Sequence, residues 1–226
     1  QVSPADLGAV VINALLERNN LDPALIEDVI FGCVSQIGPQ TFNVARTAVL
    51  ASNLPIEVPG VTVDRQCGSG QQAIHFAAQA VMSGNQDMII AGGVENMSMT
   101  PIGSPLLVAS KAGMRTPFDG EAISSRYPGV EFSQFVGAER MAEKYAVSRD
   151  DLDHFAYQSH VKGAAAYDDN RFDREIIPMT VEVEGQKVVH DVDEGLRRNA
   201  TLEAIQGLEP LQEGGLITAG SASQIC

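Results

Sequence analysis

Cysteines, basic residues and long apolar runs are all scarce in this sequence. Only three cysteines occur in 226 residues, which excludes a disulfide scaffold and fits a reducing compartment, the cytoplasm. Fifteen Lys and Arg against 29 Asp and Glu give a formal net charge of −14, so general binding to nucleic acid or to an anionic membrane is not expected. No apolar run approaches the roughly 20 residues that a membrane helix needs, and we expect no signal peptide.

The composition is typical of a folded globular protein. Hydrophobic residues make up 44% and charged residues 19%, which excludes an intrinsically disordered chain. The 226 residues correspond to one large domain or two small ones, long enough to bury a sizeable core.

The first 95 residues alternate between helical and strand-like patterns. We expect helices from Ser3, over 43–53 and over 68–83, and short buried strands over 29–34, 61–63 and 88–91. This alternation predicts an α/β layer in which parallel strands are covered on both faces.

The pattern changes after Glu95. Residues 96–132 hold many Gly, Pro, Ser and Met without a long periodic run, which predicts a functional loop or an excursion. Two helices are expected over 134–146 and 149–169, and strand-like segments follow near 176–190.

The segment that carries chemistry is DRQCGSGQQA, residues 64–73, which joins a predicted strand to a predicted helix. Cys67 would lie at the helix N-terminus, where unpaired backbone N–H groups and the helix dipole favour the thiolate, the nucleophilic form. Gly68 and Gly70 remove side chains beside the sulfur, so a substrate can approach closely. The alternative, that Cys67 is a small buried apolar residue, stays open at this point.

The sequence does not identify a base for this thiol. His75 is eight positions from Cys67, a rise of roughly 12 Å along a helix, whereas a hydrogen bond needs about 3 Å. His75 is therefore expected to be an ordinary helix-face residue, and nothing places His154, His160 or His190 beside the sulfur. No His-x-x-Cys or Cys-x-x-Cys spacing supports a metal site.

Two motifs together resemble the thiolase family, the acetyl-CoA C-acyltransferases, which include 3-oxoacyl-CoA thiolases and acetoacetyl-CoA thiolases. They are QCGSGQQA at residues 66–73 and IIAGGVENMS at residues 89–98. Further agreement comes from FGCV at 31–34, NVAR at 43–46, NRFDREIIP at 170–178 and ITAGSAS at 217–223. The resemblance implies an α/β, thiolase-like αβαβα layered fold made of two similar halves, with a loop domain inserted into the first.

The same resemblance implies that this chain is partial. Residues 1–95 would form the N-terminal α/β half without its opening strand, residues 96–215 the loop domain, and residues 216–226 the segment that returns to the N-terminal half. The family's C-terminal half would be absent, and with it a histidine in Gly-His-Pro, a second cysteine in Cys-Gly-Gly and an asparagine in Asn-Glu-Ala-Phe. Cys226 lacks the Cys-Gly-Gly motif and is expected to be incidental.

The resemblance also implies an activity in which Cys67 carries an acyl group as a thioester. Thiolases cleave 3-oxoacyl-CoA with CoA to acetyl-CoA and a shortened acyl-CoA, or run the reverse condensation. CoA and acyl-CoA are then substrates, no tightly bound cofactor or metal is expected, and the full-length protein is expected to be a homodimer or homotetramer. This chain alone is expected to be inactive. The alternative is a non-enzymatic CoA- or acyl-CoA-binding remnant; a decarboxylating ketoacyl synthase fits the surroundings of Cys67 less well.

Four further residues match the family's CoA contacts. Arg197 matches the arginine that meets the adenosine end of CoA, and Ala219, Gly220 and Ser223 match positions beside the pantetheine. Small residues suit a narrow tunnel, and a serine hydroxyl can bond an amide. Residues 133–134 are Ser-Gln where acetoacetyl-CoA-type members have His-Met, which argues against the short-chain biosynthetic subtype. Acyl-chain length and reaction direction stay open.

Overall fold

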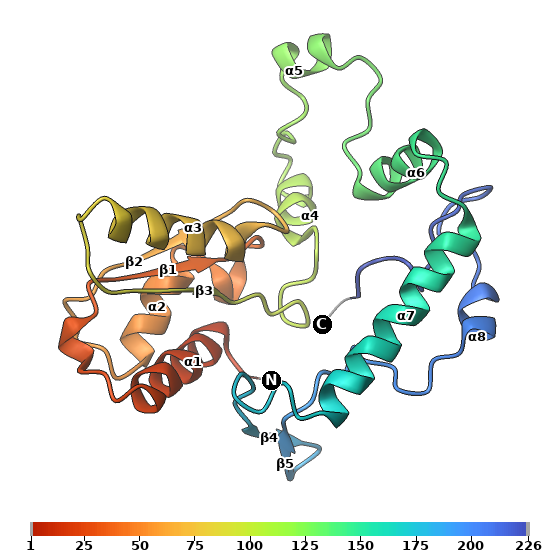
Figure 1. The fold of residues 1–226 in the computed structure, drawn as a ribbon. Helices are drawn as coiled ribbons and strands as arrows, with labels where there is room; N and C mark the ends of the chain where they lie inside the picture. Colours follow the sequence, from red (N-terminus) through yellow and green to blue (C-terminus); the bar gives the residue numbers. More distant parts are fainter. Residues whose placement is uncertain (1, 225–226) are drawn as a thin grey trace. The chain divides into compact units, whose positions relative to one another are not determined.

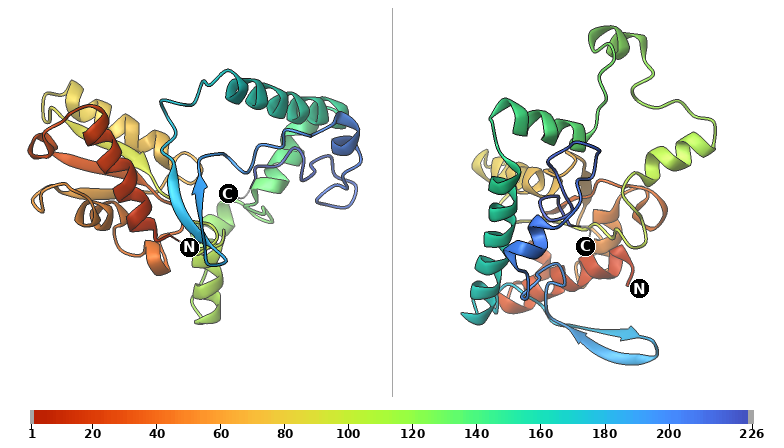
Figure 2. Two further views of the ribbon diagram at one scale, coloured as in Figure 1. Left: turned by 90° about the horizontal axis from the view of Figure 1, so that it is seen from below. Right: turned by 90° about the vertical axis from the view of Figure 1, so that its right-hand side faces the viewer.

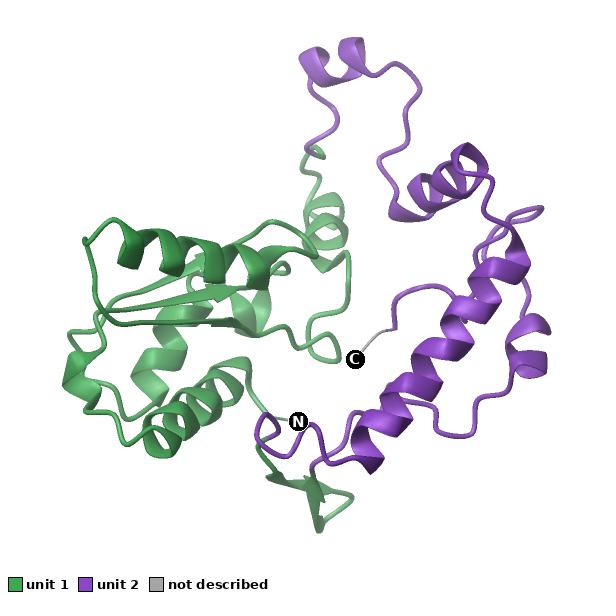
Figure 3. Cartoon of the chain, in the orientation of Figure 1, with its two compact units in different colours: residues 1–116, 177–190 green, residues 117–176, 191–226 purple. Residues whose placement is uncertain are grey.

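The computed structural model describes residues 2–224. The chain forms two compact units (Figures 1 and 3): residues 1–116 with 177–190, and residues 117–176 with 191–226. The first unit contains all the β-strands of the described residues, and the second unit is helical.

A parallel three-stranded sheet in the order β2-β1-β3 forms the centre of the first unit. The strands are β1 (Asp28–Gly32), β2 (Gly60–Val63) and β3 (Ile89–Gly93). Parallel neighbours need long crossover connections, which α2 (Val44–Ala51) provides between β1 and β2, and α3 (Ser69–Met82) between β2 and β3.

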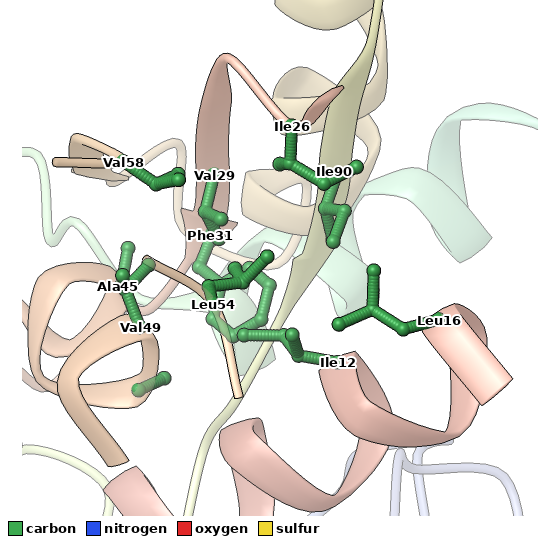
Figure 4. Packing of buried hydrophobic residues seen from close by; sticks show 11 residues of the cluster. Ile12, Leu16, Ile26, Val29, Phe31, Ala45, Val49, Leu54, Val58 and Ile90 are labelled. Carbon is green, nitrogen blue, oxygen red and sulfur yellow. The ribbon is translucent and has the colours of Figure 1, made fainter. Parts of the chain in front are cut away.

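Helices cover both faces of this sheet (Figure 1), as the sequence predicts. Successive side chains of a strand point to opposite faces, so Phe31 packs against α1 (Pro4–Arg18) and α2, while Ile30 packs under α3. The larger core cluster surrounds Phe31 (Figure 4). It comprises Ile12, Leu16, Ile26, Val29, Phe31, Ala45, Ala48, Val49, Leu54, Val58 and Ile90.

Asn43 both begins α2 and ties this helix to β2. Its Oδ1 accepts the Arg46 N–H at 3.1 Å as an N-cap, and its Nδ2 donates to the Gly60 carbonyl at 2.7 Å. The Arg46 guanidinium donates to the carbonyls of Val58 and Ile56 at 2.5 and 2.7 Å. The first and last residues of NVAR thus have structural roles in holding the chain between α2 and β2.

The stretch 96–132 contains two helices that the sequence does not predict. They are α4 (Ser104–Lys111) and α5 (Glu121–Arg126), and neither has a buried residue. Because a helix that buries no face needs no apolar stripe, these helices leave no periodic pattern in the sequence. Two short 3₁₀ helices, Pro23–Leu25 and Gly38–Gln40, complete the helices of the first unit.

The strand-like segments near 176–190 form an antiparallel hairpin (Figure 2). β4 (Met179–Val183) pairs with β5 (Gln186–His190) across the two-residue turn of Glu184 and Gly185. Both turn residues have positive φ, 50° and 79°, as a type I′ turn requires.

The second unit is organised around α7 (Arg149–Asp168), which follows α6 (Gln134–Lys144) and carries α8 (Leu202–Gln206) along its side (Figures 1 and 2). Arg149 joins the two helices. Its Nε donates to the buried Asp153 carboxylate at 2.7 and 2.9 Å, and its Nη2 donates to three carbonyls at the end of α8. Those carbonyls have no partner inside a helix, so a single arginine caps α8 and anchors it. Among the described residues, no helix is long and apolar enough to cross a bilayer.

Candidate active site

Cys67 lies in the tight turn between β2 and α3. Gln66, directly before it, has a left-handed backbone with φ of 47°, and Gly68, directly after it, is the N-cap of α3. The Cys67 side chain is exposed. The predicted position of this cysteine, at the junction of a strand with a helix N-terminus, is therefore confirmed, while its role as a nucleophile stays a prediction.

Side-chain hydrogen bonds hold this turn in place. The Asp64 carboxylate accepts the Gln66 N–H at 2.7 Å. The Ser69 hydroxyl accepts the Arg65 N–H at 2.9 Å and donates to the Gln66 carbonyl at 2.5 Å. A left-handed non-glycine residue costs on the order of 1 kcal/mol, and these bonds offset that cost. Asp64 and Ser69 are structural residues of the site that the sequence does not identify as such.

Glycines let the backbone of β1 approach the start of α3. A Cβ added at Gly32 would lie 2.5 Å from both Gly70 N and Ser69 C, and one added at Gly93 would lie 2.7 Å from the Gly32 carbonyl oxygen. A side chain at Gly32 would push the start of α3, and with it the Cys67 turn, away from the sheet, whereas one at Gly93 would separate β3 from β1. By contrast, a Cβ at Gly70 would meet no atom within 4 Å, so the space beside that glycine is open.

The IIAGGVENMS motif contributes a polar network at the ends of β1 and β3. The Glu95 carboxylate accepts the N–H groups of Val34 and Ser35 at 2.6 and 3.1 Å and the Gln40 amide at 3.0 Å. Gln40 is fully buried, and its Oε1 accepts the Asn96 N–H at 2.6 Å. Glu95 and Asn96 therefore hold the loops that follow the two strands.

The two described cysteines have opposite surroundings. Cys33 is 1% exposed, and burial together with the nearby Glu95 carboxylate raises the pKa of its thiol to about 12. At neutral pH it is a protonated, inaccessible thiol. Cys226 lies outside the described residues. Cys67 is thus the accessible one of the two thiols that the structure describes.

The described residues of the first unit supply no base at Cys67. None of their side chains hydrogen-bonds its sulfur, and His75, exposed on α3, makes no bond to it, as the helix rise predicts. In the second unit, the His154 ring contacts the Asp150 carbonyl and carboxylate, and His160 accepts the Arg197 N–H. Nor do residues 2–224 contain three His, Cys, Asp or Glu side chains grouped to hold a metal ion.

All four residues expected to contact CoA lie in the second unit. Arg197 is exposed, and within residues 2–224 its guanidinium makes no ion pair or hydrogen bond. Its neighbour Arg198 pairs with Asp168 at 2.6 Å and stacks on the Tyr167 ring, 5.6 Å from its centroid. Of these two adjacent arginines, Arg197 is therefore the one with an uncommitted positive charge.

Ala219 and Gly220 lie in a tight turn closed by the N–H groups of Ser221 and Ala222 on the Thr218 carbonyl, and Ser223 follows this turn. The Gly220 N–H donates to Oγ1 of the buried Thr218 at 3.2 Å. A Cβ at Gly220 would lie 3.0 Å from the side chains of Ile205 in α8 and of Leu208 just after it. Close packing is therefore a second reason for a glycine at this position. Ala219 and Ser223 are exposed.

Glu139 on α6 supports the strand-like segment that enters this turn. Its carboxylate accepts the N–H groups of Leu216 and Ile217 at 2.9–3.0 Å. Ser133, the residue found here in place of the histidine of acetoacetyl-CoA-type members, is the N-cap of α6. Its hydroxyl accepts the Val136 N–H at 3.4 Å. The sequence does not predict the Glu139 contacts, because they join residues that are 77 and 78 positions apart.

Known proteins resemble this chain along its whole length. The sequence matches the family model for the N-terminal domain of thiolase over residues 1–226. It is 49% identical over 225 residues to the steroid 3-ketoacyl-CoA thiolase FadA6 of Mycobacterium tuberculosis, covering 99% of this chain and 54% of that protein. It is 39% identical over 234 residues to the β-ketoadipyl-CoA thiolase of Acinetobacter baylyi, covering 97% of this chain and 57% of that protein.

The structure agrees with these matches. The crystal structure of the Bacillus anthracis acetyl-CoA acetyltransferase superposes with a TM-score of 0.82 at 31% identity, covering 99% of this chain and 57% of that one. The chain thus spans about half the length of the curated relatives it matches. With the family match, the relatives and the α/β architecture in agreement, the chain belongs to the thiolase family.

Proposed function

We propose that the complete protein is an acyl-CoA acyltransferase of the thiolase type, which cleaves 3-oxoacyl-CoA with CoA through a thioester on Cys67. The observation that carries this proposal is the exposed Cys67 thiol in a chain of the thiolase family. This thiol lies on a turn at the N-terminus of α3 that side-chain hydrogen bonds hold in place. Unpaired backbone N–H groups at a helix start favour negative charge there, which suits a thiolate nucleophile.

The reaction proceeds in two transfers. The Cys67 thiolate adds to the 3-keto carbon, the bond between carbons 2 and 3 breaks, and carbon 2 takes up a proton as acetyl-CoA leaves. The shortened acyl group stays on Cys67 as a thioester. The thiolate of a second CoA attacks this thioester and releases the shortened acyl-CoA together with the Cys67 thiolate. Open space beside Gly70 supports access of a substrate to the turn.

CoA is polyanionic, so a protein with a net charge of −14 needs local positive charge to bind it. We propose that Arg197 supplies this charge at the adenosine end of CoA, since its guanidinium is uncommitted within the described residues. Ala219, Gly220 and Ser223 would line the pantetheine, where their small side chains leave room and the exposed Ser223 hydroxyl can bond an amide.

The substrate we favour is a 3-oxoacyl-CoA longer than acetoacetyl-CoA, consumed in the degradative direction of β-oxidation. Residues 133–134 are Ser-Gln rather than the His-Met of acetoacetyl-CoA-type members, and Ser133 serves as a helix cap. One relative is named for a steroid 3-ketoacyl-CoA substrate. We further propose that the protein lies in the cytoplasm, because a nucleophilic thiol must stay reduced, and that it forms a homo-oligomer, as the resemblance to the thiolase family implies.

A thiolysis assay on the complete encoded protein tests the proposal, with acetoacetyl-CoA and a longer 3-oxoacyl-CoA as substrates. Cys67→Ser should lower turnover by about 10³-fold or more, because a serine hydroxyl is far less ionised at neutral pH. Cys33→Ala is the matched control and should keep turnover. Mass spectrometry after acid quench should find the acyl group on the peptide that contains Cys67.

The runner-up function, non-enzymatic CoA or acyl-CoA binding, gives a different result in the same experiment. Such a protein would bind CoA but turn over neither substrate. Full activity in Cys67→Ser would show that another group carries the acyl chain. A faster reaction with acetoacetyl-CoA than with the longer substrate would contradict the preferred chain length and leave the reaction class intact.

A further inference from the structure

The main chain around Arg197 is attached to one face of α7. His160 Nδ1 accepts the Arg197 N–H at 3.3 Å, and the Tyr167 hydroxyl accepts the Asp193 N–H at 2.9 Å. His160 and Tyr167 are seven positions apart, two helical turns, so both lie on the same stripe of the helix. The segment 193–198 therefore runs along α7 and is fixed at both ends of this stripe.

Packing between these two points brings the segment close to the helix. A Cβ at Gly163, between His160 and Tyr167 on the stripe, would lie 2.9 Å from the Leu196 side chain. The glycine thus makes room for Leu196 against α7. With Leu196 packed and the Arg198 guanidinium held by Asp168, the residue between them has a defined main-chain position and a free side chain.

We infer that His160 is a positioning residue for CoA binding, which holds the Arg197 main chain so that the guanidinium is presented to CoA. The inference rests on the proposed function, since it assigns Arg197 to CoA. An acceptor at Nδ1 requires the neutral ring with its proton on Nε2. Ordering a backbone segment costs conformational entropy, and a segment that is ordered before the ligand arrives does not lose this entropy again on binding.

The expected effect is on CoA affinity and not on the chemical step. His160→Phe keeps the ring but removes the acceptor, and should weaken CoA binding about fivefold, the equivalent of one net hydrogen bond. His160→Asn should bind within about twofold of the wild type, because its Oδ1 can take the place of Nδ1. KM for CoA should follow these changes, and kcat should stay within about twofold for both variants.

Titration calorimetry with CoA on the complete encoded protein measures these affinities. His154→Phe is the matched control, because His154 lies on the same helix but its ring contacts Asp150 and not the Arg197 segment. Arg197→Ala should weaken binding about tenfold or more, as expected for a charge-assisted contact. In the Arg197→Ala background, His160→Phe should cause no further loss, because its effect acts through Arg197.

The outcomes separate the inference from the function on which it rests. The positioning role is wrong, and the CoA contact stands, if Arg197→Ala weakens CoA binding but His160→Phe does not. The same conclusion follows if His160→Phe lowers the affinity for CoA by the same factor in the Arg197→Ala background as in the wild type. If Arg197→Ala leaves CoA affinity unchanged, both the contact and the positioning role are wrong, while the Cys67→Ser assay still reports on the reaction. Should His160→Phe fail to fold, His160→Leu replaces it in the same cycle.

Discussion

Two thiols in one small unit carry different chemistry because their surroundings differ. Cys33 lies in the core with 1% of its surface exposed, next to a carboxylate that is itself held by three hydrogen bonds. Cys67 is exposed on the turn that starts α3. Burial and a neighbouring negative charge both oppose ionisation of a thiol, so the same side chain is inert at one position and available at the other.

Alkylation distinguishes the two cysteines directly. With limiting iodoacetamide at neutral pH, the peptide that contains Cys67 should be labelled at least about 100-fold faster than the peptide that contains Cys33. Peptide mass spectrometry measures both rates, and labelling in urea is the control, since both thiols should react alike once unfolded. Equal rates in the folded protein would contradict both the burial of Cys33 and the proposed nucleophile.

Cys33 should also make stability depend on alkaline pH. Its pKa is raised from the usual value of 9.0 to about 12 in the folded state, so the unfolded chain loses this proton first as pH rises. The free energy of unfolding should therefore fall between pH 9 and about 12, by up to roughly 1.4 kcal/mol per pH unit from this group. Urea denaturation of the wild type and of Cys33→Ala isolates the effect: the stability difference should shrink from pH 8 to pH 10. A difference that does not change with pH would show that Cys33 ionises normally.

The sequence could indicate Cys67 but not the residues that support it. The pattern of strand, Cys-Gly-x-Gly and helix is local, and it correctly locates the thiol at a helix start. Glu95 contacts backbone groups some 60 positions away, and such a contact leaves no periodic pattern around either partner. The hydroxyl of Ser69 is likewise indistinguishable in sequence from that of any polar residue in a first helical turn.

At the scale of elements, prediction succeeded where an element buries one face. The three strands of the parallel sheet and helices α1, α2 and α3 agree with the prediction, because each has apolar residues at the spacing that burial requires. Helices α6 and α7 agree with it as well, although α6 buries only Ala142 and α7 only Asp153 and Ala156. The short helices α4 and α5 bury nothing, and α8 buries only Ile205, so an apolar stripe could not reveal them. The loop assigned to 96–132 is therefore the largest departure from expectation.

The contact between β1 and α3 gives a test with an internal control. Gly32→Ala should destabilise the protein by roughly 1–3 kcal/mol, because the new Cβ would meet backbone atoms that cannot rotate away. Gly70→Ala, in the same contact but facing open space, should be neutral or stabilising by up to about 1 kcal/mol through helix propensity. Thermal denaturation measures both, and equal losses for the two variants would contradict the close approach at Gly32.

At the scale of the whole molecule, the outer face of α3 is unusually apolar. Ile74, Val81 and Met82 lie on the side of α3 away from its buried residues and are exposed, Met82 at 87%. Large apolar side chains that are exposed together on one helix form a surface that water solvates poorly. A chain of these 226 residues, produced by itself, should therefore bind hydrophobic dyes and self-associate through this face.

Paired charge substitutions on α3 test whether this face is the cause. Ile74→Lys with Met82→Lys should lower dye binding and shift the 226-residue chain towards a monomeric elution volume, because two exposed apolar side chains are removed. Gln71→Lys with Gln79→Lys changes the net charge by the same amount on exposed positions of the same helix, and should leave association nearly unchanged. If both pairs lower dye binding and self-association equally, the net charge and not the apolar face limits solubility. If the wild-type chain elutes as a monomer and melts sharply, the exposed side chains of α3 do not drive association, and the prediction is wrong.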